Sequence, residues 1–259
     1  RDRSPSRGLG DVYKRQHPHV YAYISYYYAM EGIMITVSDR LSEESAKDYV
    51  LRQLTYNIVN VNLIPGEQID IPQLCTLFSV SRSPVREAEL DLASRQLIDI
   101  RPKIGAFVSY IDADLVEEVR QLRSILEAEL AVMACDVLTP TQVDRLWENI
   151  AMWQMYISRG NDEKTLLLDK EFHAMIYKMC GKSFWLELIE SASPHFDRTS
   201  ILSVKCHKTD NIIHDHQELV TAIEQHDKEK AARIAKLHMT RYIENFSTLK
   251  ENFPDYFKK

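Results

Sequence analysis

Apolar residues recur at helical spacing along almost the whole of residues 112–250, and strand-like alternation is nearly absent there. One stripe runs from Val116 through Val119 and Leu122 to Met133, and Asp112 is suitably placed to cap the helix that carries it. Similar patterns predict further helices near residues 140–150, 163–180, 183–193, 196–204, 210–225 and 228–249. With short connections between them, these segments predict an antiparallel bundle of six or seven helices.

The composition excludes several classes of protein. Only seven of the 259 residues are glycine, which argues against collagen-like or glycine-rich sequences. The longest apolar runs span only a few residues, too few for a transmembrane helix. The four cysteines are scattered and form no paired motif, so we expect a cytoplasmic protein without a disulfide framework. The net charge of −6 excludes an arginine-rich nucleic-acid coat but allows a small basic patch.

The first residues do not resemble part of a domain. Asp11–Gln16 can be encoded by a transposon end that is used to prepare sequencing libraries, so we interpret residues 1–16 as a translated adapter. Residues 17–33 are either a translated leader or a tyrosine-rich arm. Because the start of the sequence is polar and has no apolar core segment, no signal peptide is expected there. The native start is expected at Met30 or Met34, and residues 1–33 are left out of the predicted domains.

Residues 42–110 carry a different pattern. Val50, Leu54 and Ile58 mark one helix, Pro72 can open a second, and Ser83 followed by proline is typical of a capped third helix. Two short strands are expected at 97–100 and 106–108, joined by a turn. Three helices and a β-hairpin form, in this order, a winged helix-turn-helix, whose third helix enters the DNA major groove.

The detailed sequence of this segment resembles the GntR family of bacterial transcription regulators. The resemblance rests on Pro65-Gly66-Glu67, on the run from Ser79 to Ala88, and on Pro102-x-x-Gly105-Ala106-Phe107-Val108. It implies that DNA is contacted by the start of the third helix and by the wing, through Ser81, Arg82, Ser83, Arg86, Lys103 and Gly105. The chemistry agrees, because a helix N-terminus attracts phosphate and arginine can bind guanine through two hydrogen bonds.

Three residues depart from the family pattern. Glu89 stands where leucine is usual, Gln96 where glycine ends the helix, and Ile104 where the wing commonly carries a basic residue. Between Asp48 and Val108, six basic residues are opposed by seven acidic ones. We therefore expect non-specific attraction to phosphate to be weak and strongly dependent on salt.

Three histidines and one aspartate have spacings that can bring them together in the bundle. Asp169 and His173 are four residues apart on one helix and share a face. His216 and His238 lie about ten residues before and about eleven residues after a turn, which puts them at similar heights in an antiparallel hairpin. These ligand types suit zinc, nickel or manganese. The alternative is that the histidines are ordinary core residues with satisfied hydrogen bonds.

The same region resembles the FCD domain of the FadR subgroup. The resemblance rests on Arg123-x-x-x-Glu127, Asp169-x-x-Phe172-His173, and the block from Asp215-His216 to His238. It implies that Asp169, His173, His216 and His238 hold a divalent metal, whose coordination a small carboxylate often completes. It also implies that Arg123, and secondarily Arg198, bind the carboxylate of the effector.

Together these patterns predict a mainly α protein with a winged helix-turn-helix at 42–110 and an FCD-type domain at 112–250. We expect a metal-dependent, ligand-responsive transcription regulator, a repressor of a catabolic operon, that binds an inverted-repeat DNA site as a homodimer without a membrane partner or catalysis. Two alternatives remain: the same regulator with a structural metal and no effector, or a metal-dependent hydrolase built on a helical bundle.

Overall fold

The computed structural model describes residues 26–30, 33–206, 210–244 and 246–259, which separate into two compact units at Val108 and Ser109. The interpretation of residues 1–16 as an adapter lies outside the described residues. Within the part of the chain that the structure describes, no helix is long and apolar enough to cross a membrane.

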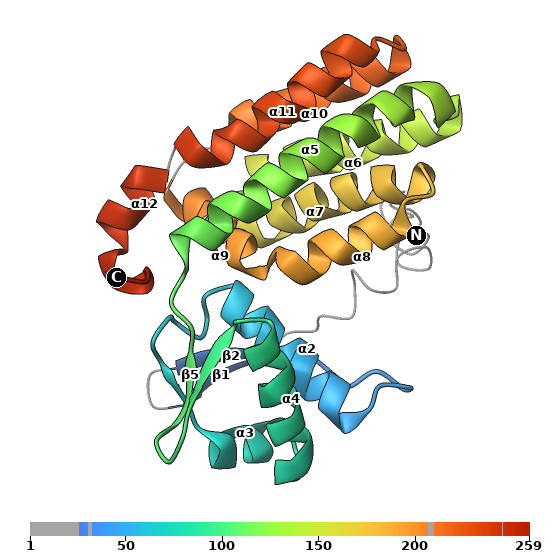
Figure 1. Cartoon of the computed structure of the whole chain (residues 1–259). Coiled ribbons are helices and arrows are strands. Elements are labelled where there is room, and N and C mark those ends of the chain that lie inside the picture. Colours follow the sequence, from blue (N-terminus) through green and yellow to red (C-terminus); the bar gives the residue numbers. More distant parts are fainter. Residues whose placement is uncertain (1–25, 31–32, 207–209, 245) are drawn as a thin grey trace. The chain divides into compact units, whose positions relative to one another are not determined.

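The first unit is the expected winged helix-turn-helix (Figure 1). Its helices are α2 (Ala46–Val59), α3 (Ile71–Leu77) and α4 (Arg82–Ser94). The wing consists of β4 (Ile98–Arg101) and β5 (Gly105–Val108), which pair in antiparallel fashion. Leu54 and Ile58 of α2 and Val85 and Leu92 of α4 are fully buried, so one apolar core fixes the orientation of α4 within the unit.

Two details of this unit differ from the sequence expectation. The helix α4 begins at Arg82 with Ser81 as its N-cap, two residues earlier than the predicted cap at Ser83. Pro84 is compatible with this start, because the first N–H groups of a helix have no partner within it. In addition, a short strand β3 (Gln68–Ile69) pairs with β5 and gives the sheet order β3-β5-β4, whereas only two strands were expected.

A hairpin that the sequence pattern does not predict precedes the three helices. It consists of β1 (Tyr26–Met30) and β2 (Ile33–Val37). The buried side-chain amide of Asn57 accepts a hydrogen bond from Thr36 N (2.8 Å) and donates one to Thr36 O (2.9 Å). The Asn57 amide thus makes the two hydrogen bonds that a neighbouring strand would make with Thr36, and it attaches β2 to α2.

The second unit is the expected helical bundle. Its helices are α5 (Ala113–Val137), α6 (Pro140–Ser158), α7 (Asp162–Met179), α8 (Ser183–Ala192), α9 (Pro194–Cys206), α10 (Asp210–Glu224), α11 (Lys228–Glu244) and α12 (Phe246–Asn252). Asp112 caps α5 through hydrogen bonds from Asp114 N and Leu115 N, as the sequence indicated. The long helix α5 packs along α11, which in turn packs against α10 (Figure 1). The last expected helix, 228–249, corresponds to α11 and α12, and residue 245 between them lies outside the description.

The end of α4 generates a stability prediction. Gln96, where the family pattern has glycine, adopts a left-handed backbone with φ 58°, and its N–H bonds to Ala93 O. This conformation is costly for any residue with a Cβ atom. We expect Gln96→Gly to raise the free energy of unfolding by about 0.5–1 kcal/mol, as measured by urea denaturation. Arg95→Gly is the control: Arg95 has φ −90°, so no strain is relieved and stability should not rise.

Candidate functional sites

The start of α4 presents the residues that were expected to contact DNA. Ser81, Arg82, Ser83 and Arg86 are all exposed, while Val85 is buried beneath them. Ser83 Oγ donates a hydrogen bond to Glu87 Oε1 (3.0 Å). The polar face of the helix N-terminus therefore combines two guanidinium groups with unpaired backbone N–H groups, a combination that attracts phosphate.

The wing supplies the other two expected residues. Lys103 is exposed at the tip with φ 65°, and Gly105 follows with φ 144°. A Cβ atom at Gly105 would lie 2.8 Å from Gln68 Nε2, which itself donates a hydrogen bond to Ile104 O (3.3 Å). The backbone angle favours glycine here, and any larger residue would also displace the amide of Gln68, which was not among the predicted site residues.

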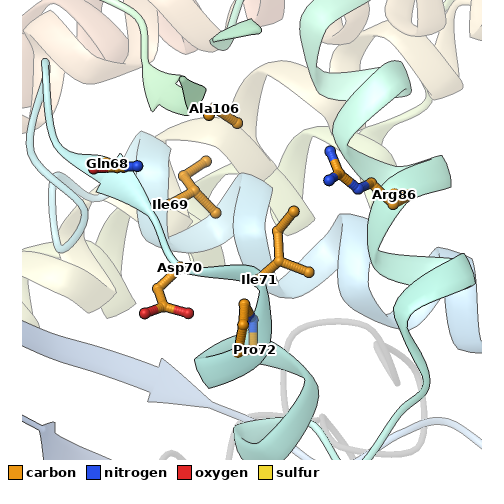
Figure 2. A pocket seen from close by; sticks show the side chains of 8 residues that line it. Gln68, Ile69, Asp70, Ile71, Pro72, Arg86 and Ala106 are labelled. Atoms are coloured by element: carbon orange, nitrogen blue, oxygen red, sulfur yellow. The ribbon is translucent and has the colours of Figure 1, made fainter. Parts of the chain in front are cut away.

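Helix α4 and the wing border one hollow of about 470 Å³. Arg86 reaches into this hollow from α4, as Figure 2 shows, and Gly105 lines it from the wing. The remaining lining comes from β3, the start of α3 and β5: Gln68, Ile69, Asp70, Ile71, Pro72 and Ala106. The structure therefore brings Arg86 and Gly105, predicted separately, to a single concave surface.

A buried carboxylate lies behind Arg86. Glu89 is 1% exposed, and its Oε2 atom is 3.4 Å from Nη1 of Arg86. Burial raises the pKa of Glu89 above its ordinary value, and the charge of Arg86 opposes this effect in part. The other carboxylate oxygen, Oε1, is buried without a hydrogen-bond partner.

The second unit brings all four predicted metal ligands together. Asp169 and His173 come from α7, His216 from α10 and His238 from α11. The Nε2 atom of His238 is 3.2 Å from that of His216 and 3.2 Å from that of His173. Asp169 Oδ1 is 3.8 Å from His173 Nε2 and 3.7 Å from His216 Nε2. One ligand atom from each residue lies within 4.8 Å of all the others.

The orientation of the imidazoles favours a cation at their centre. His173 Nδ1 donates to Glu127 Oε2 (2.9 Å), which leaves a lone pair on Nε2 directed at the cluster. Burial, together with the neighbouring His238, His173 and Arg123, holds the pKa of His216 well below its ordinary value. Imidazoles whose Nε2 atoms converge in this way are suited to coordinating a positive ion.

The residues present fit a bound metal ion. Asp169 Oδ1, which faces the cluster, is buried and has no hydrogen-bond partner, although buried polar atoms are normally paired. A metal 2.0–2.2 Å from nitrogen and oxygen ligands separates neighbouring ligand atoms by roughly 3–3.5 Å. The distances from His238 Nε2 to the Nε2 atoms of His216 and His173 agree with this value, and a small approach of Asp169 would complete the set.

Aromatic side chains hold the cluster in an apolar setting. The Phe172 ring stacks on that of His216 with centroids 4.1 Å apart, and Trp153 meets His216 edge-on at 4.7 Å. Phe172 and Trp153 belong to the buried core of the bundle. The packing therefore fixes the imidazole orientations and keeps the surrounding dielectric low.

Arg123 lies next to the cluster, joined to it through Glu127. Its Nε and Nη2 atoms are 2.9 and 2.8 Å from Glu127 Oε1, and its guanidinium lies 4.8 Å from the centroid of the Phe196 ring. Burial opposes ionisation of Glu127, but Arg123 and His173 hold its pKa below the ordinary value. Glu127 was not among the predicted site residues, although its i, i+4 spacing from Arg123 indicates that the two side chains can pair on one helix face.

Arg198, the second predicted effector residue, is fully buried in α9 and contacts the start of the second unit. Its Nη1 donates to Ser109 O (2.7 Å), and its Nη2 contacts Tyr110 O (3.4 Å) and His195 Nδ1 (2.9 Å). Besides His195 on its own helix, Arg198 thus contacts the segment that directly follows the wing.

Two regions of the chain match known domain families. The family of bacterial regulatory proteins called gntR matches residues 46–108, and the FCD domain matches residues 118–241. Over 227 residues the chain is 25% identical to the HTH-type transcriptional repressor RspR of Escherichia coli, covering 87% of this chain and all of that protein. It is 24% identical to the gluconate operon transcriptional repressor of Bacillus subtilis, with 83% and 88% covered.

Solved structures show the same fold. Escherichia coli McbR/YncC has a TM-score of 0.69 at 22% identity, covering 81% of this chain and 99% of that one. A GntR-type regulator from a Rhodococcus species has a TM-score of 0.65 at 19% identity, with 80% and 99% covered. The two family matches together show that the chain has a GntR-family DNA-binding domain followed by a C-terminal FCD domain, and that it is a DNA-binding transcriptional regulator of the GntR family.

Proposed function

We propose that this regulator is a repressor that binds an inverted-repeat operator as a homodimer and whose FCD domain holds a divalent metal that senses a small carboxylate. The observation that carries the sensing part of this proposal is the convergence of Asp169, His173, His216 and His238. The names of two relatives, the repressor RspR and the gluconate operon repressor, support the direction of regulation.

Zinc is the metal that we expect first, with nickel and manganese as alternatives. Three imidazoles and one carboxylate are borderline ligands that suit all three ions. Glu127 behind His173, and Asp215 3.8 Å from His238 Nδ1, are the carboxylate partners that metal-binding histidines usually have. When bound, the ion supplies a fixed positive charge that attracts and positions an anion.

Arg123 is our candidate for the residue that recognises the effector carboxylate. A guanidinium has five N–H donors in a planar fork, a geometry that matches carboxylates. Arg123 is 7% exposed, so an ion pair formed there is poorly screened by water. Glu127 holds Arg123 on one side and His173 on the other, so the proposed effector and metal sites share one hydrogen-bonded partner.

Helix α9 offers a route from this site to the segment after the wing. Phe196 lies under Arg123, and Arg198, two residues later on the same helix, holds the backbone of Ser109 and Tyr110. Binding at Arg123 that shifts α9 would therefore displace the residues that directly follow β5. Such a change is a population shift between two arrangements of the linker, driven by the difference in effector affinity.

Dimer formation would provide two winged helix-turn-helix domains, one for each half of a two-fold DNA site. The second unit carries exposed apolar side chains that a partner copy would cover. Phe184 (73% exposed) and Leu188 (46%) are one turn apart on α8, and Ile125 (67%) lies on α5. Their exposure supports an interface formed by the bundle.

The DNA-binding part of the proposal predicts the effect of Arg86→Ala. The full chain would be selected against a random duplex library, and the affinity for the enriched site measured by fluorescence anisotropy. We expect an inverted repeat, and we expect the substitution to weaken binding by about 10- to 100-fold, since a bidentate arginine–guanine contact is lost. The matched control, Arg95→Ala, alters an exposed arginine at the far end of α4 and should bind like the wild type. Equal loss in both variants would contradict a specific role for Arg86.

The metal part predicts that one zinc ion per chain remains after dialysis and is lost in His216→Ala. Elemental analysis gives the stoichiometry. Thermal denaturation gives the linked stabilisation, about 2.7 kcal/mol when free zinc is 100 times its dissociation constant. The control is His214→Ala, because His214 is exposed on the same helix two residues away and should not affect zinc. Zinc retained in full by His216→Ala would overturn this site.

The effector part predicts that a carboxylate raises the melting temperature only of the zinc-loaded protein. Sugar acids, hydroxy acids, dicarboxylates and amino acids form the panel. For the acid that binds, Arg123→Lys should weaken affinity by about tenfold, since lysine cannot offer the planar fork. Arg120→Lys is the control, because Arg120 pairs with Glu117 on the same helix α5. If zinc binds but no acid shifts the melting temperature, the metal is structural.

A further inference from the structure

The recognition helix inverts the expected apolar pattern at two neighbouring residues. Glu89 is 1% exposed, while Leu90 beside it is 64% exposed. On a helix with one buried face, the acid and the leucine would be expected in exchanged places. Ala88 and Leu92, on the inward face of the same helix, are fully buried and follow the normal pattern.

A carboxylate in this place reduces the stability of the domain. Burial raises the pKa of Glu89, so ionising it near neutral pH has a free-energy cost. Its Oε1 atom is buried without a hydrogen-bond partner, which adds to the cost. Leucine would fill the same place without either penalty, so stability does not account for the acid. A residue that departs from the usual apolar pattern at a cost in stability is typical of functional sites.

Arg86 is the partner that the carboxylate contacts. Its Nη1 atom is 3.4 Å from Glu89 Oε2, yet its side chain is 64% exposed and reaches into the hollow beside the wing (Figure 2). A free arginine on a helix surface samples many rotamers and can turn to any nearby phosphate. A contact with a fixed, buried oxygen on the same helix limits that motion and leaves the outer edge of the guanidinium for DNA.

The charge of the pair has a second consequence. A carboxylate so close to the guanidinium offsets part of its attraction for phosphate, and phosphate attraction supplies non-specific binding. A base edge is instead recognised by the direction of the N–H groups, which the carboxylate fixes. The same contact therefore weakens sequence-independent binding and favours sequence-dependent binding.

We propose that Glu89 is a positioning residue that orients Arg86 toward one base pair and reduces its attraction for phosphate, thereby raising sequence discrimination. This inference rests on the proposed role of Arg86 in DNA recognition. Discrimination here means the ratio of affinities for the selected operator and for operators changed at a single base pair.

The test compares Glu89→Leu, Glu89→Gln, Arg86→Ala and the double variant of Glu89→Leu with Arg86→Ala in the full chain. Each binds the selected operator, its single-base variants and an unrelated duplex of equal length, over a range of salt concentrations. Glu89→Leu should bind the unrelated duplex several-fold more tightly, and the slope of log affinity against log salt should steepen by about one. Discrimination at the base pair read by Arg86 should fall about tenfold.

The other variants separate positioning from structure. Glu89→Gln keeps an oxygen acceptor for Arg86, so discrimination should be largely retained. In the Arg86→Ala background, Glu89→Leu should change neither discrimination nor the salt slope, since the pair interaction is already absent. Thermal denaturation should show Glu89→Leu to be at least as stable as the wild type, which excludes unfolding as the cause.

Two results would overturn the inference, and they are distinguishable. If Arg86→Ala removes discrimination at one base pair while Glu89→Leu leaves it intact, Arg86 reads DNA without help from Glu89. If Arg86→Ala itself leaves every base preference intact, the proposed role of Arg86 is wrong and the role of Glu89 fails with it.

Discussion

The convergence of three imidazole Nε2 atoms and one carboxylate oxygen inside an apolar bundle is the constraint on which the second unit depends. Lone pairs held this close, between the rings of Phe172 and Trp153, are costly to bury unless a positive charge lies among them. A cation there would fasten α7, α10 and α11 together. Glu127 links His173 to Arg123, and Phe196 links Arg123 to α9. The cluster is therefore continuous with the helix whose Arg198 holds the residues after the wing.

Two residues of the winged helix-turn-helix unit are not the residues that would be most stable at their positions. Gln96 occupies a backbone conformation suited to glycine, and Glu89 occupies a core position suited to leucine. Glu89 contacts Arg86, a residue expected to contact DNA, and this contact gives its departure a functional interpretation. Because seven acidic residues oppose six basic ones between Asp48 and Val108, this domain cannot rely on general attraction to phosphate. Selectivity must then come from the directed contacts of a few side chains, of which Arg86 is the best placed.

The sequence was sufficient to predict the winged helix-turn-helix followed by a helical bundle, and to predict that the four candidate metal ligands lie close together. Helical periodicity and the cap at Asp112 predict the bundle. Because His216 and His238 are about equally far from one turn, they are predicted to lie at similar heights in the helical hairpin. What it could not predict were contacts between residues far apart in the chain. No periodic pattern in the sequence indicates the hydrogen bond between Asn57 and Thr36 of β2 or the pairing of β3 with β5. The same holds for the hydrogen bond that Arg198 donates to Ser109 O. The start of α4 was misplaced by two residues because Pro84 is compatible with either cap.

The central claim is that the metal and its carboxylate ligand control DNA binding through the bundle. It is tested most directly by one titration of the selected operator with three forms of the protein: metal-free, zinc-loaded, and zinc-loaded with the carboxylate that binds. If the claim is correct, the carboxylate weakens operator affinity of the zinc-loaded protein at least fivefold, a typical lower limit for allosteric coupling, and has no effect on the metal-free protein. Identical operator affinities in all three forms would contradict it.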